Sequence, residues 1–260
     1  MDTLSEQHLQ FMVDDRKPRN TIAGRRRVLA LVGNAGTATR EELEAWWLTR
    51  ADLAPATRSA DLSHLRAFYR WCQRWEHRAD DPTLRIDAPK VPNGMPRPLS
   101  KADLQTLLEQ MEPDMRRAAC LGAYAGVRVS EAAAAMWADV DRETNRLRVL
   151  GKGQKTRLVA ISPLLLDDLL PDTGGNIVTG TDQVLTAAQL ERKVNRAIRQ
   201  CGVDATFHQL RHRYGTIAYQ ATQDLVAVGR QMGHASVVTT AVYAAASDEQ
   251  ADKIAQAVFR

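Results

Sequence analysis

The sequence predicts a mainly α-helical protein with a small β-sheet, divided into a helical N-terminal domain and a mixed α/β C-terminal domain. Three observations carry this prediction. Before about Ser100, apolar residues recur at three- and four-residue steps, which is typical of amphipathic helices. Five of the ten prolines lie between Pro82 and Pro98, where no apolar periodicity is present. Further on, two short β-type runs flank the glycine-rich stretch 151–156, which indicates a hairpin.

Composition limits the class of protein. The chain has 260 residues, 44% hydrophobic and 25% charged, which is typical of a soluble globular protein with room for two cores. Its net charge of +4 permits a polyanionic partner without requiring one. The three cysteines show neither a disulfide framework nor metal-ligand spacing. No run of eighteen apolar residues and no secretion signal are present, so we expect no membrane insertion and a cytoplasmic location.

The N-terminal region carries the clearest helical patterns. Thr39 precedes a first turn that holds two glutamates, which predicts a helix start there. The segment from Ala56 to Trp75 has one apolar stripe and one basic face, and the basic face consists of Arg58, His64, Arg66, Arg70 and Arg74. A second basic stretch, from Arg16 to Arg27, contains no acid. Each basic face is either simply solvated or placed to meet phosphates, and the residues alone leave both interpretations open.

The proline-rich stretch separates the two domains. Proline removes an amide donor and favours extended geometry in the residue before it, so this stretch is neither a helix nor an interior strand. We predict a helical domain at 1–84, a linker at 85–98 and a second domain at 99–260. Ser100 caps the first helix of the second domain, with Asp103 three residues later.

In the second domain we predict helices and one hairpin. Between Met115 and Met136 a buried helix is interrupted near Gly126, which places Arg128 at a helix junction in apolar surroundings. A charge there must be paired, for instance with Glu131, or must face a ligand. The hairpin presents Lys152 at its tip. Further helices are predicted at Thr186–Gln200, at Thr206–Gln220, at Gln223–Met232 with Thr222 as its cap, and at Asp248–Arg260.

Polar residues near the C-terminus carry the candidate chemistry. His208 and Arg211 lie one turn apart on a predicted helix, His234 follows the end of the next helix, and Tyr243 comes nine residues later. Imidazole, guanidinium and phenol groups near one another suit the handling of a negatively charged oxygen centre by a phenolic nucleophile. A tyrosine taken alone is usually structural, and we assign that role to Tyr69, Tyr124, Tyr214 and Tyr219. We assign His212, next to the arginine, to packing.

Four motifs in this order resemble the tyrosine recombinase (phage integrase) family, over nearly the whole chain. Ala125–Glu131 is similar to the family's first arginine box, and Gly151–Arg157 is similar to its β-hairpin lysine motif. His208–Arg211 is similar to its His-x-x-Arg box, and Gly233-His234 with Tyr243 resembles its last box. The N-terminal region resembles the family's helical core-binding domain and begins almost at the first residue, as in a compact phage integrase or a Xer-like member.

The resemblance implies seven catalytic residues, which are Arg128, Glu131, Lys152, His208, Arg211, His234 and Tyr243. The tyrosine would be the nucleophile, and the two arginines would clamp the phosphate. The lysine would act as general acid, the glutamate would support the first arginine, and the histidines would donate hydrogen bonds or handle protons. No cofactor and no metal are implied, because the arginines take the place of a cation.

The resemblance also implies double-stranded DNA as the substrate, bound by a homo-tetramer. The residues predicted to contact DNA from the N-terminal domain are Arg25, Arg26, Arg58, His64 and Arg66. A DNA-bending or directionality factor is left open as a further partner. The implied reaction is site-specific recombination, for phage integration or excision. Two alternatives stay open: a type IB topoisomerase-like or resolvase enzyme with the same chemistry, and a catalytically silent DNA-binding protein.

Overall fold

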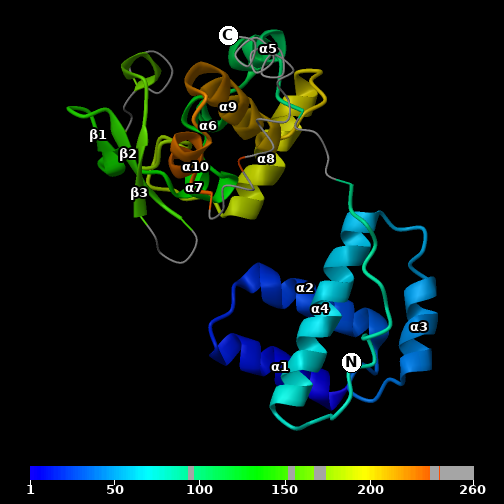
Figure 1. Ribbon diagram of the computed structural model, residues 1–260. Helices are drawn as coiled ribbons and strands as arrows, with labels where there is room; N and C mark the ends of the chain where they lie inside the picture. The colour runs from blue at the N-terminus through cyan, green and yellow to red at the C-terminus, as the bar shows by residue number, and fades with distance from the viewer. Residues whose placement is uncertain (93–96, 152–155, 167–173, 235–239, 241–260) are drawn as a thin grey trace, which may run out of the picture. The chain divides into compact units, whose positions relative to one another are not determined.

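The computed structural model describes residues 1–92, 97–151, 156–166, 174–234 and 240 (Figure 1). The chain divides into two compact units, Met1–Asn93 and Gly94–Arg260, and the division falls inside the stretch predicted as a linker. Each unit has its own buried apolar cluster. The fold is mainly helical with one small sheet, as predicted. Among the described residues, no helix is both long enough and apolar enough to cross a membrane.

The helices of the N-terminal unit pack around one apolar core. The helices are α1 (Thr3–Asp14), α2 (Arg19–Val32), α3 (Arg40–Leu48) and α4 (Pro55–Arg74). Apolar side chains such as Leu29 and Phe68 are fully buried between them. Thr39 caps α3 and forms a capping box with Glu42, which confirms the predicted helix start. Pro55 opens α4 at a position where an amide would have no partner within the helix.

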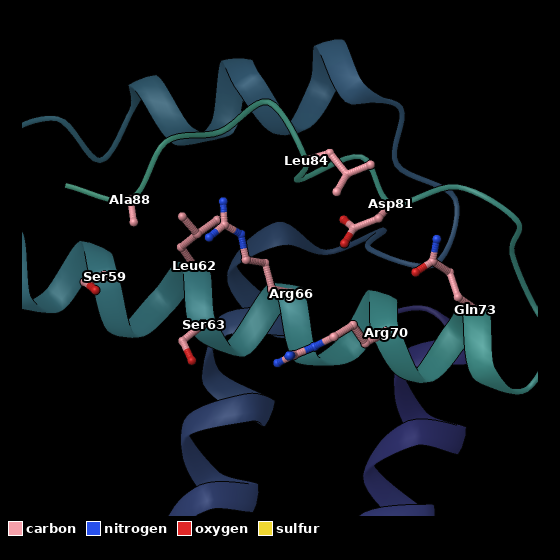
Figure 2. Close-up of a pocket in the computed structure, with 9 residues that line it drawn as sticks. All are labelled: Ser59, Leu62, Ser63, Arg66, Arg70, Gln73, Asp81, Leu84 and Ala88. Carbon is pink, nitrogen blue, oxygen red and sulfur yellow. The ribbon is translucent and has the colours of Figure 1, made fainter.

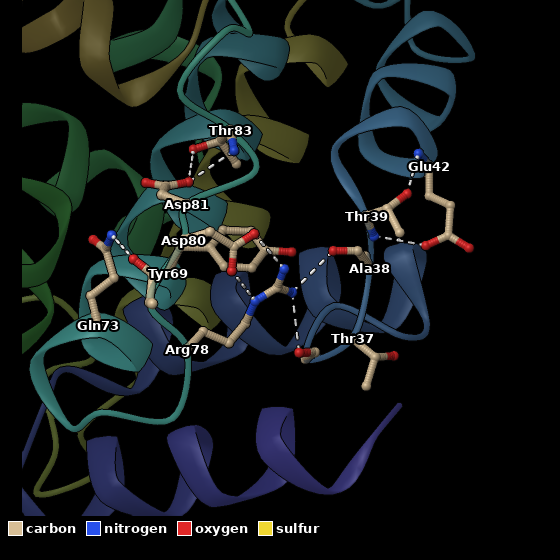
Figure 3. Close-up of polar contacts among 12 residues, drawn as sticks. Thr37, Ala38, Thr39, Glu42, Tyr69, Gln73, Arg78, Asp80, Asp81 and Thr83 are labelled. Carbon is tan, nitrogen blue, oxygen red and sulfur yellow. Dashed lines mark hydrogen bonds and ion pairs between the residues drawn. The ribbon is translucent and has the colours of Figure 1, made fainter.

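The chain that leaves α4 folds back onto the same unit. Arg78 donates through Nη1 to the carbonyl oxygens of Gly36 and Ala38, at 3.1 and 3.0 Å, and its Nη2 pairs with Asp80 at 2.8 Å (Figure 3). Ile86, which lies in the predicted linker, is buried in the core of this unit. The segment after α4 is therefore packed on the N-terminal unit at least as far as Ile86.

The C-terminal unit combines helices with an antiparallel sheet of order β1-β2-β3. Its helices are α5 (Lys101–Gln110), α6 (Pro113–Ala125), α7 (Val129–Ala134), α8 (Ala187–Gln200), α9 (Phe207–Thr222) and α10 (Leu225–Met232), with a 3₁₀ turn at Trp137–Asp139. Its strands are β1 (Val140–Asp141), β2 (Arg146–Leu150) and β3 (Thr156–Ala160). Leu147 of β2 pairs with Val159 of β3, and both side chains are buried in the core. The two predicted hairpin strands are confirmed; the tip with Lys152 and the helix predicted at 248–260 lie outside the described residues.

Two helix boundaries differ from the prediction. Helix α9 continues past Gln220 to Thr222, and α10 begins at Leu225 with Asp224, not Thr222, as its cap. The Asp224 carboxylate accepts hydrogen bonds from the amides two and three residues later, both at 2.9 Å, so it takes the capping role. The Thr222 hydroxyl instead donates to the carbonyl of Ala218, one turn earlier in α9.

A buried histidine lies in the N-terminal core. His8 is 3% exposed, and the rings of Phe68 and Trp71 lie 5.4 and 4.7 Å from its ring. Arg25 Nη1 lies 2.7 Å from His8 Nε2, and because a guanidinium can only donate, this nitrogen is an acceptor without a proton. Burial, and then the charge of Arg25, lowers the pKa of His8 to about 3.

We expect His8 to make folding stability depend on pH. The unfolded chain protonates this histidine below about pH 6.5 and the folded chain only near pH 3, so stability falls as the pH is lowered between these values. At pH 5 the loss that His8 contributes, relative to pH 8, is about 2 kcal/mol. Denaturant unfolding at both pH values checks this: the loss should be smaller in His8→Gln and unchanged in the control His77→Gln, an exposed position. An equal loss in His8→Gln would contradict the assignment.

Candidate active site

The first corner of the site lies between α6 and α7. Gly126 ends α6 with φ of +63°, which confirms the predicted glycine stop. Arg128 is the N-cap of α7; its amide donates to Glu131 Oε2 at 2.7 Å, and its Nη1 donates to Oε1 at 3.0 Å. The Arg128 side chain is 39% exposed, whereas Glu131 is 4% exposed. The corner thus presents a guanidinium to solvent with a buried carboxylate behind it.

Helix α9 brings Arg211 to this corner by packing closely on α6. A Cβ on Gly122 of α6 would lie 3.2 Å from the Cβ of Leu210, so glycine favours the close approach. The Arg211 side chain is buried and donates through Nη1 to the carbonyl of Gly126 and through Nη2 to that of Met232, the latter at 2.8 Å. The buried guanidinium therefore links the end of α6 to the end of α10.

Arginines surround the C-terminal end of α10. The last carbonyls of a helix carry partial negative charge and lack partners within the helix. The donors to them are Arg157 Nε to Gln231 at 3.0 Å, Arg211 Nη2 to Met232 at 2.8 Å and Arg128 Nη2 to Gly233 at 2.7 Å. The chain then turns at Gly233, with φ of +69°, and the His234 amide donates to the carbonyl of Gly229 at 2.9 Å. These bonds fix the backbone that leads into His234.

Glu131 joins the three arginines. Arg157 donates to both of its oxygens, at 2.7 and 2.9 Å, and Arg211 Nη1 lies 4.0 Å from Oε2. Burial alone would raise the pKa of this carboxyl, but the hydrogen bonds from Arg157 and from the Arg128 amide hold the pKa below its ordinary value. The carboxylate is therefore ionised at neutral pH. Three cations around one anion leave an excess of positive charge, which suits a phosphodiester.

The histidines of the site are neutral at pH 7. Burial, and then the charge of Arg211, lowers the pKa of His208 and lowers that of His234 to about 4. His234 Nδ1 lies 2.9 Å from Thr240 Oγ1. His212 packs edge-on against His208 with ring centroids 4.2 Å apart, and burial followed by that neighbour lowers its pKa to about 4. Neutral imidazoles can accept a proton from a nucleophile.

A metal centre is not formed by the part of the chain that the structure describes. Within residues 1–92, 97–151, 156–166 and 174–234, no group of three or more His, Cys, Asp or Glu side chains is arranged to hold a metal ion. The cations that surround Glu131 and the end of α10 are the arginines Arg128, Arg157 and Arg211.

The structure connects part of the predicted catalytic set. Four of its members form one bonded group, which consists of Arg128, Glu131, Arg211 and His234 with the end of α10. His208 lies one turn before the arginine of α9, and Lys152 and Tyr243 lie outside the described residues. Sequence reasoning missed Arg157, which it treated only as a strand residue. The available signal was its position at the end of the motif Gly151–Arg157.

One of the predicted DNA contacts, Arg25, is buried inside the N-terminal unit, and a second, His64, is half-buried beside it. Arg25 is 6% exposed, and besides His8 it bonds through Nε to His64 Nδ1 at 3.4 Å. Burial, and then the charge of Arg70, lowers the pKa of Arg25 to about 10, so it stays charged at pH 7. Arg26, the next residue, is exposed on α2. Arg25 therefore ties α1, α2 and α4 together, and Arg26 is the member of this pair that faces solvent.

One face of α4 carries polar side chains at helical spacing, which are Ser59, Ser63, Arg66, Arg70 and Gln73. With Asp81, Leu84 and Ala88 they border a hollow of about 520 Å³ (Figure 2). Arg66 Nη2 donates to the carbonyl of Ile86 at 2.6 Å, and Arg58 lies 4.5 Å from the centroid of the Trp47 ring. Arg58 and Arg66 of this helix thus make contacts within the unit, and Arg66 also borders an open hollow.

Comparison with known proteins adds the family. The sequence profile of the phage integrase family matches residues 97–250. Tyrosine recombinase XerD of Xanthomonas axonopodis pv. citri (strain 306) is 33% identical over 236 residues, which cover 80% of this chain and 77% of that protein. Tyrosine recombinase XerD of Pseudomonas aeruginosa is 32% identical over 238 residues, covering 84% and 79%. A crystal structure of a lambda integrase(75–356) dimer bound to a COC′ core site has a TM-score of 0.77, at 17% identity and 94% coverage of both chains, and this shows a shared fold.

A mainly helical fold with a small sheet, and arginines gathered around a buried glutamate, agree with the class that the relatives define, the tyrosine recombinases. The matched profile covers more than half of the chain, and both relatives exceed 30% identity. The chain belongs to the phage integrase family. It is a site-specific DNA recombinase, and the predicted family, fold class and enzyme class are confirmed.

Proposed function

We propose that this recombinase cuts and rejoins double-stranded DNA through a 3′-phosphotyrosyl bond to Tyr243. The observation that carries the proposal is the group of three arginines around Glu131, beside the backbone that leads into His234. Its excess positive charge is complementary to a phosphodiester whose charge grows in the transition state. Tyr243 and Lys152 enter the proposal from their sequence motifs.

In the first step, the phenolic oxygen of Tyr243 forms a bond to phosphorus, and the bond from phosphorus to the 5′-oxygen breaks. Arg128 and Arg211 bind the non-bridging oxygens, where charge increases as the bond forms. The phosphotyrosyl bond retains the free energy of the broken phosphodiester. The 5′-hydroxyl of a second strand can therefore reverse the step without ATP, and this joins the strands in a new combination.

Two protons move in this step. The phenol has an ordinary pKa of about 10 and must lose its proton, which a neutral imidazole of His208 or His234 can accept. A bound phosphate places negative charge beside these imidazoles and raises their pKa from the low values of the free protein, which makes them better bases. Lys152 supplies the proton that the departing 5′-oxygen needs.

In the N-terminal unit we assign DNA contact to Arg26 and to the polar face of α4. Arg26 is exposed, and Arg66 borders the hollow on that face, so both can reach phosphates. We also assign DNA contact to Arg58, a half-buried arginine on the same helix. Arg25 and His64 bond to each other, so their contribution is to hold α2 against α4.

The proposed biological reaction is phage integration or excision by a homo-tetramer on DNA in the bacterial cytoplasm, with a DNA-bending or directionality factor as an open partner. The similarity to proteins named tyrosine recombinase XerD supports recombination in general. The shared fold with a DNA-bound lambda integrase dimer supports assembly on DNA. The competing functions are a topoisomerase-like or resolvase enzyme and a catalytically silent DNA-binding protein.

Nicked suicide substrates drawn from DNA that flanks the gene test the proposal. We expect a covalent protein–DNA adduct on a denaturing gel, with the attached nucleotide mapped by mass spectrometry to the peptide that contains Tyr243. An adduct on another residue would reject Tyr243 as the nucleophile. Tight binding without an adduct would favour the silent DNA-binding protein, and cleavage without strand exchange would favour the topoisomerase-like enzyme.

A further inference from the structure

We propose that Arg157 is a positioning residue of this active site, which keeps Arg128 available to the phosphate by sharing the carboxylate of Glu131 with it. Arg157 is the second residue of β3, and it is not one of the seven catalytic residues that the motifs imply. The inference rests on the proposed function, because the group it positions is the proposed phosphate clamp.

All three nitrogens of the Arg157 guanidinium donate hydrogen bonds to other groups of the protein. Its Nη1 and Nη2 donate to the two oxygens of Glu131, at 2.7 and 2.9 Å, and its Nε donates to the carbonyl of Gln231 at 3.0 Å. The side chain is 15% exposed, against 39% for Arg128. Such a two-pronged pair is specific to arginine, since a lysine ammonium cannot make both bonds in one plane. Arg157 thus contacts protein groups, and Arg128 is the more exposed of the two.

Competition for Glu131 Oε1 gives Arg157 its effect on Arg128. This one oxygen accepts from Arg157 at 2.7 Å and from Arg128 at 3.0 Å. A buried carboxylate that loses one partner binds its remaining partners more tightly, because its charge has no water to replace the lost bonds. Without Arg157, the Arg128 guanidinium would be drawn toward Glu131 and would have less free charge for a phosphate oxygen.

A second set of contacts ties β3 to the end of α10. Arg157 Nε donates to the Gln231 carbonyl, and the Gln231 side chain donates through Nε2 to the carbonyl of Ala160, at 3.1 Å. Figure 1 shows α10 near β3 within the C-terminal unit, and these two elements are in contact. His234 follows three residues after Gln231. Strand β3 thus holds the backbone that leads into a proposed proton-handling residue.

The experiment compares cleavage of the suicide substrate in single turnover by full-length variants. Arg157→Ala is expected to lower the rate constant about 30-fold, with DNA affinity changed by less than about twofold, because a misplaced clamp costs rate more than binding. The control is Arg148→Ala on β2, whose partner Asp139 lies 2.6 Å away, and it should cleave at the wild-type rate. Arg157→Lys restores the charge but not the paired hydrogen bonds to Glu131, and it should recover only part of the lost cleavage rate.

A pH profile separates positioning from a merely structural role. Removal of Arg157 takes away hydrogen bonds that hold the pKa of Glu131 down, so this pKa rises in Arg157→Ala. The variant should therefore regain rate relative to Arg148→Ala as the pH is lowered toward 5, because protonation of Glu131 removes the charge that captures Arg128. The wild type, in which the pKa of Glu131 stays low, should show no such gain. Addition of Glu131→Gln to Arg157→Ala removes the carboxylate that captures Arg128, and the double variant should cleave faster than Arg157→Ala.

The outcomes distinguish this inference from the proposed function. No adduct from the wild type would reject both. An adduct from the wild type, with Arg157→Ala equal to Arg148→Ala in rate and pH profile, would overturn the inference alone. Should Arg157→Ala fail to fold, Arg157→Lys and the double variant Glu131→Gln/Arg157→Gln, which removes both buried charges together, carry the comparison. A double variant no faster than the folded single variant would also overturn it.

Discussion

Arg211→Ala is expected to lower the single-turnover rate of DNA cleavage about 10³-fold, with DNA affinity changed by less than about fivefold. The Arg211 side chain is 4% exposed and lies 4.0 Å from Glu131, so its charge acts in a site with little water, where electrostatic stabilisation is strong. A duplex makes many phosphate contacts, so one lost contact changes binding little. Few groups stabilise the charge that develops on the one phosphate that is cleaved, so removal of one of these groups lowers the cleavage rate strongly.

Two further variants check the Arg211 prediction. Arg213→Ala changes the same helix two residues on, where Nη1 donates to the carbonyl of Leu99 at 3.2 Å, and it should keep the wild-type rate. Arg211→Lys retains charge but has one donor nitrogen where arginine uses two, to Gly126 and to Met232, so it should recover only part of the rate. Thermal unfolding of each variant excludes loss of fold. A folded Arg211→Ala that cleaves within tenfold of wild type would contradict the assignment of Arg211 to the phosphate clamp.

Much of the fold was predictable because its signals are local. Capping residues and glycine stops act within one helix turn, so Thr39, Ser100 and Gly126 marked their helix ends correctly. The predicted start of α10 was wrong because Thr222 and Asp224 are both good caps, and only the observed backbone decides between them. The proline-rich stretch also located the division between the units, while the burial of Ile86 required knowledge of the packed core.

The sequence predicted several residues of the candidate site but not the contacts among them. Motif spacing identified Arg128, Glu131 and Arg211, yet no pattern indicates that Glu131 is shared by several arginines or that they donate to the end of α10. Arg157 was missed because its partners lie 26 and 74 residues away in the sequence. Arg25 was placed on a DNA-facing surface because basic runs are usually exposed, whereas three helices enclose it through His8 and His64.

Gly233→Ala is expected to lower the cleavage rate about 100-fold and to destabilise the fold by about 1–2 kcal/mol. Gly233 has φ of +69°, a conformation that costs a side-chain-bearing residue roughly 1 kcal/mol or more. Its Cβ would also lie 2.7 Å from Arg157 Nη1 and 2.8 Å from Arg157 Cζ. The guanidinium cannot move aside freely, because it is bonded to Glu131 and Gln231, so the end of α10 and the His234 backbone must shift instead.

The control for Gly233→Ala separates backbone strain from this collision. Gly202 has φ of +74° and open space around its added Cβ, so Gly202→Ala should destabilise the fold by a similar backbone cost and leave cleavage unchanged. In the double variant Gly233→Ala/Arg157→Ala the collision is absent, and the two changes should lower the rate by less than the product of their separate effects. Multiplicative effects in that double variant would show that Gly233 and Arg157 act independently, and the close packing of this glycine on the arginine would then have no part in cleavage.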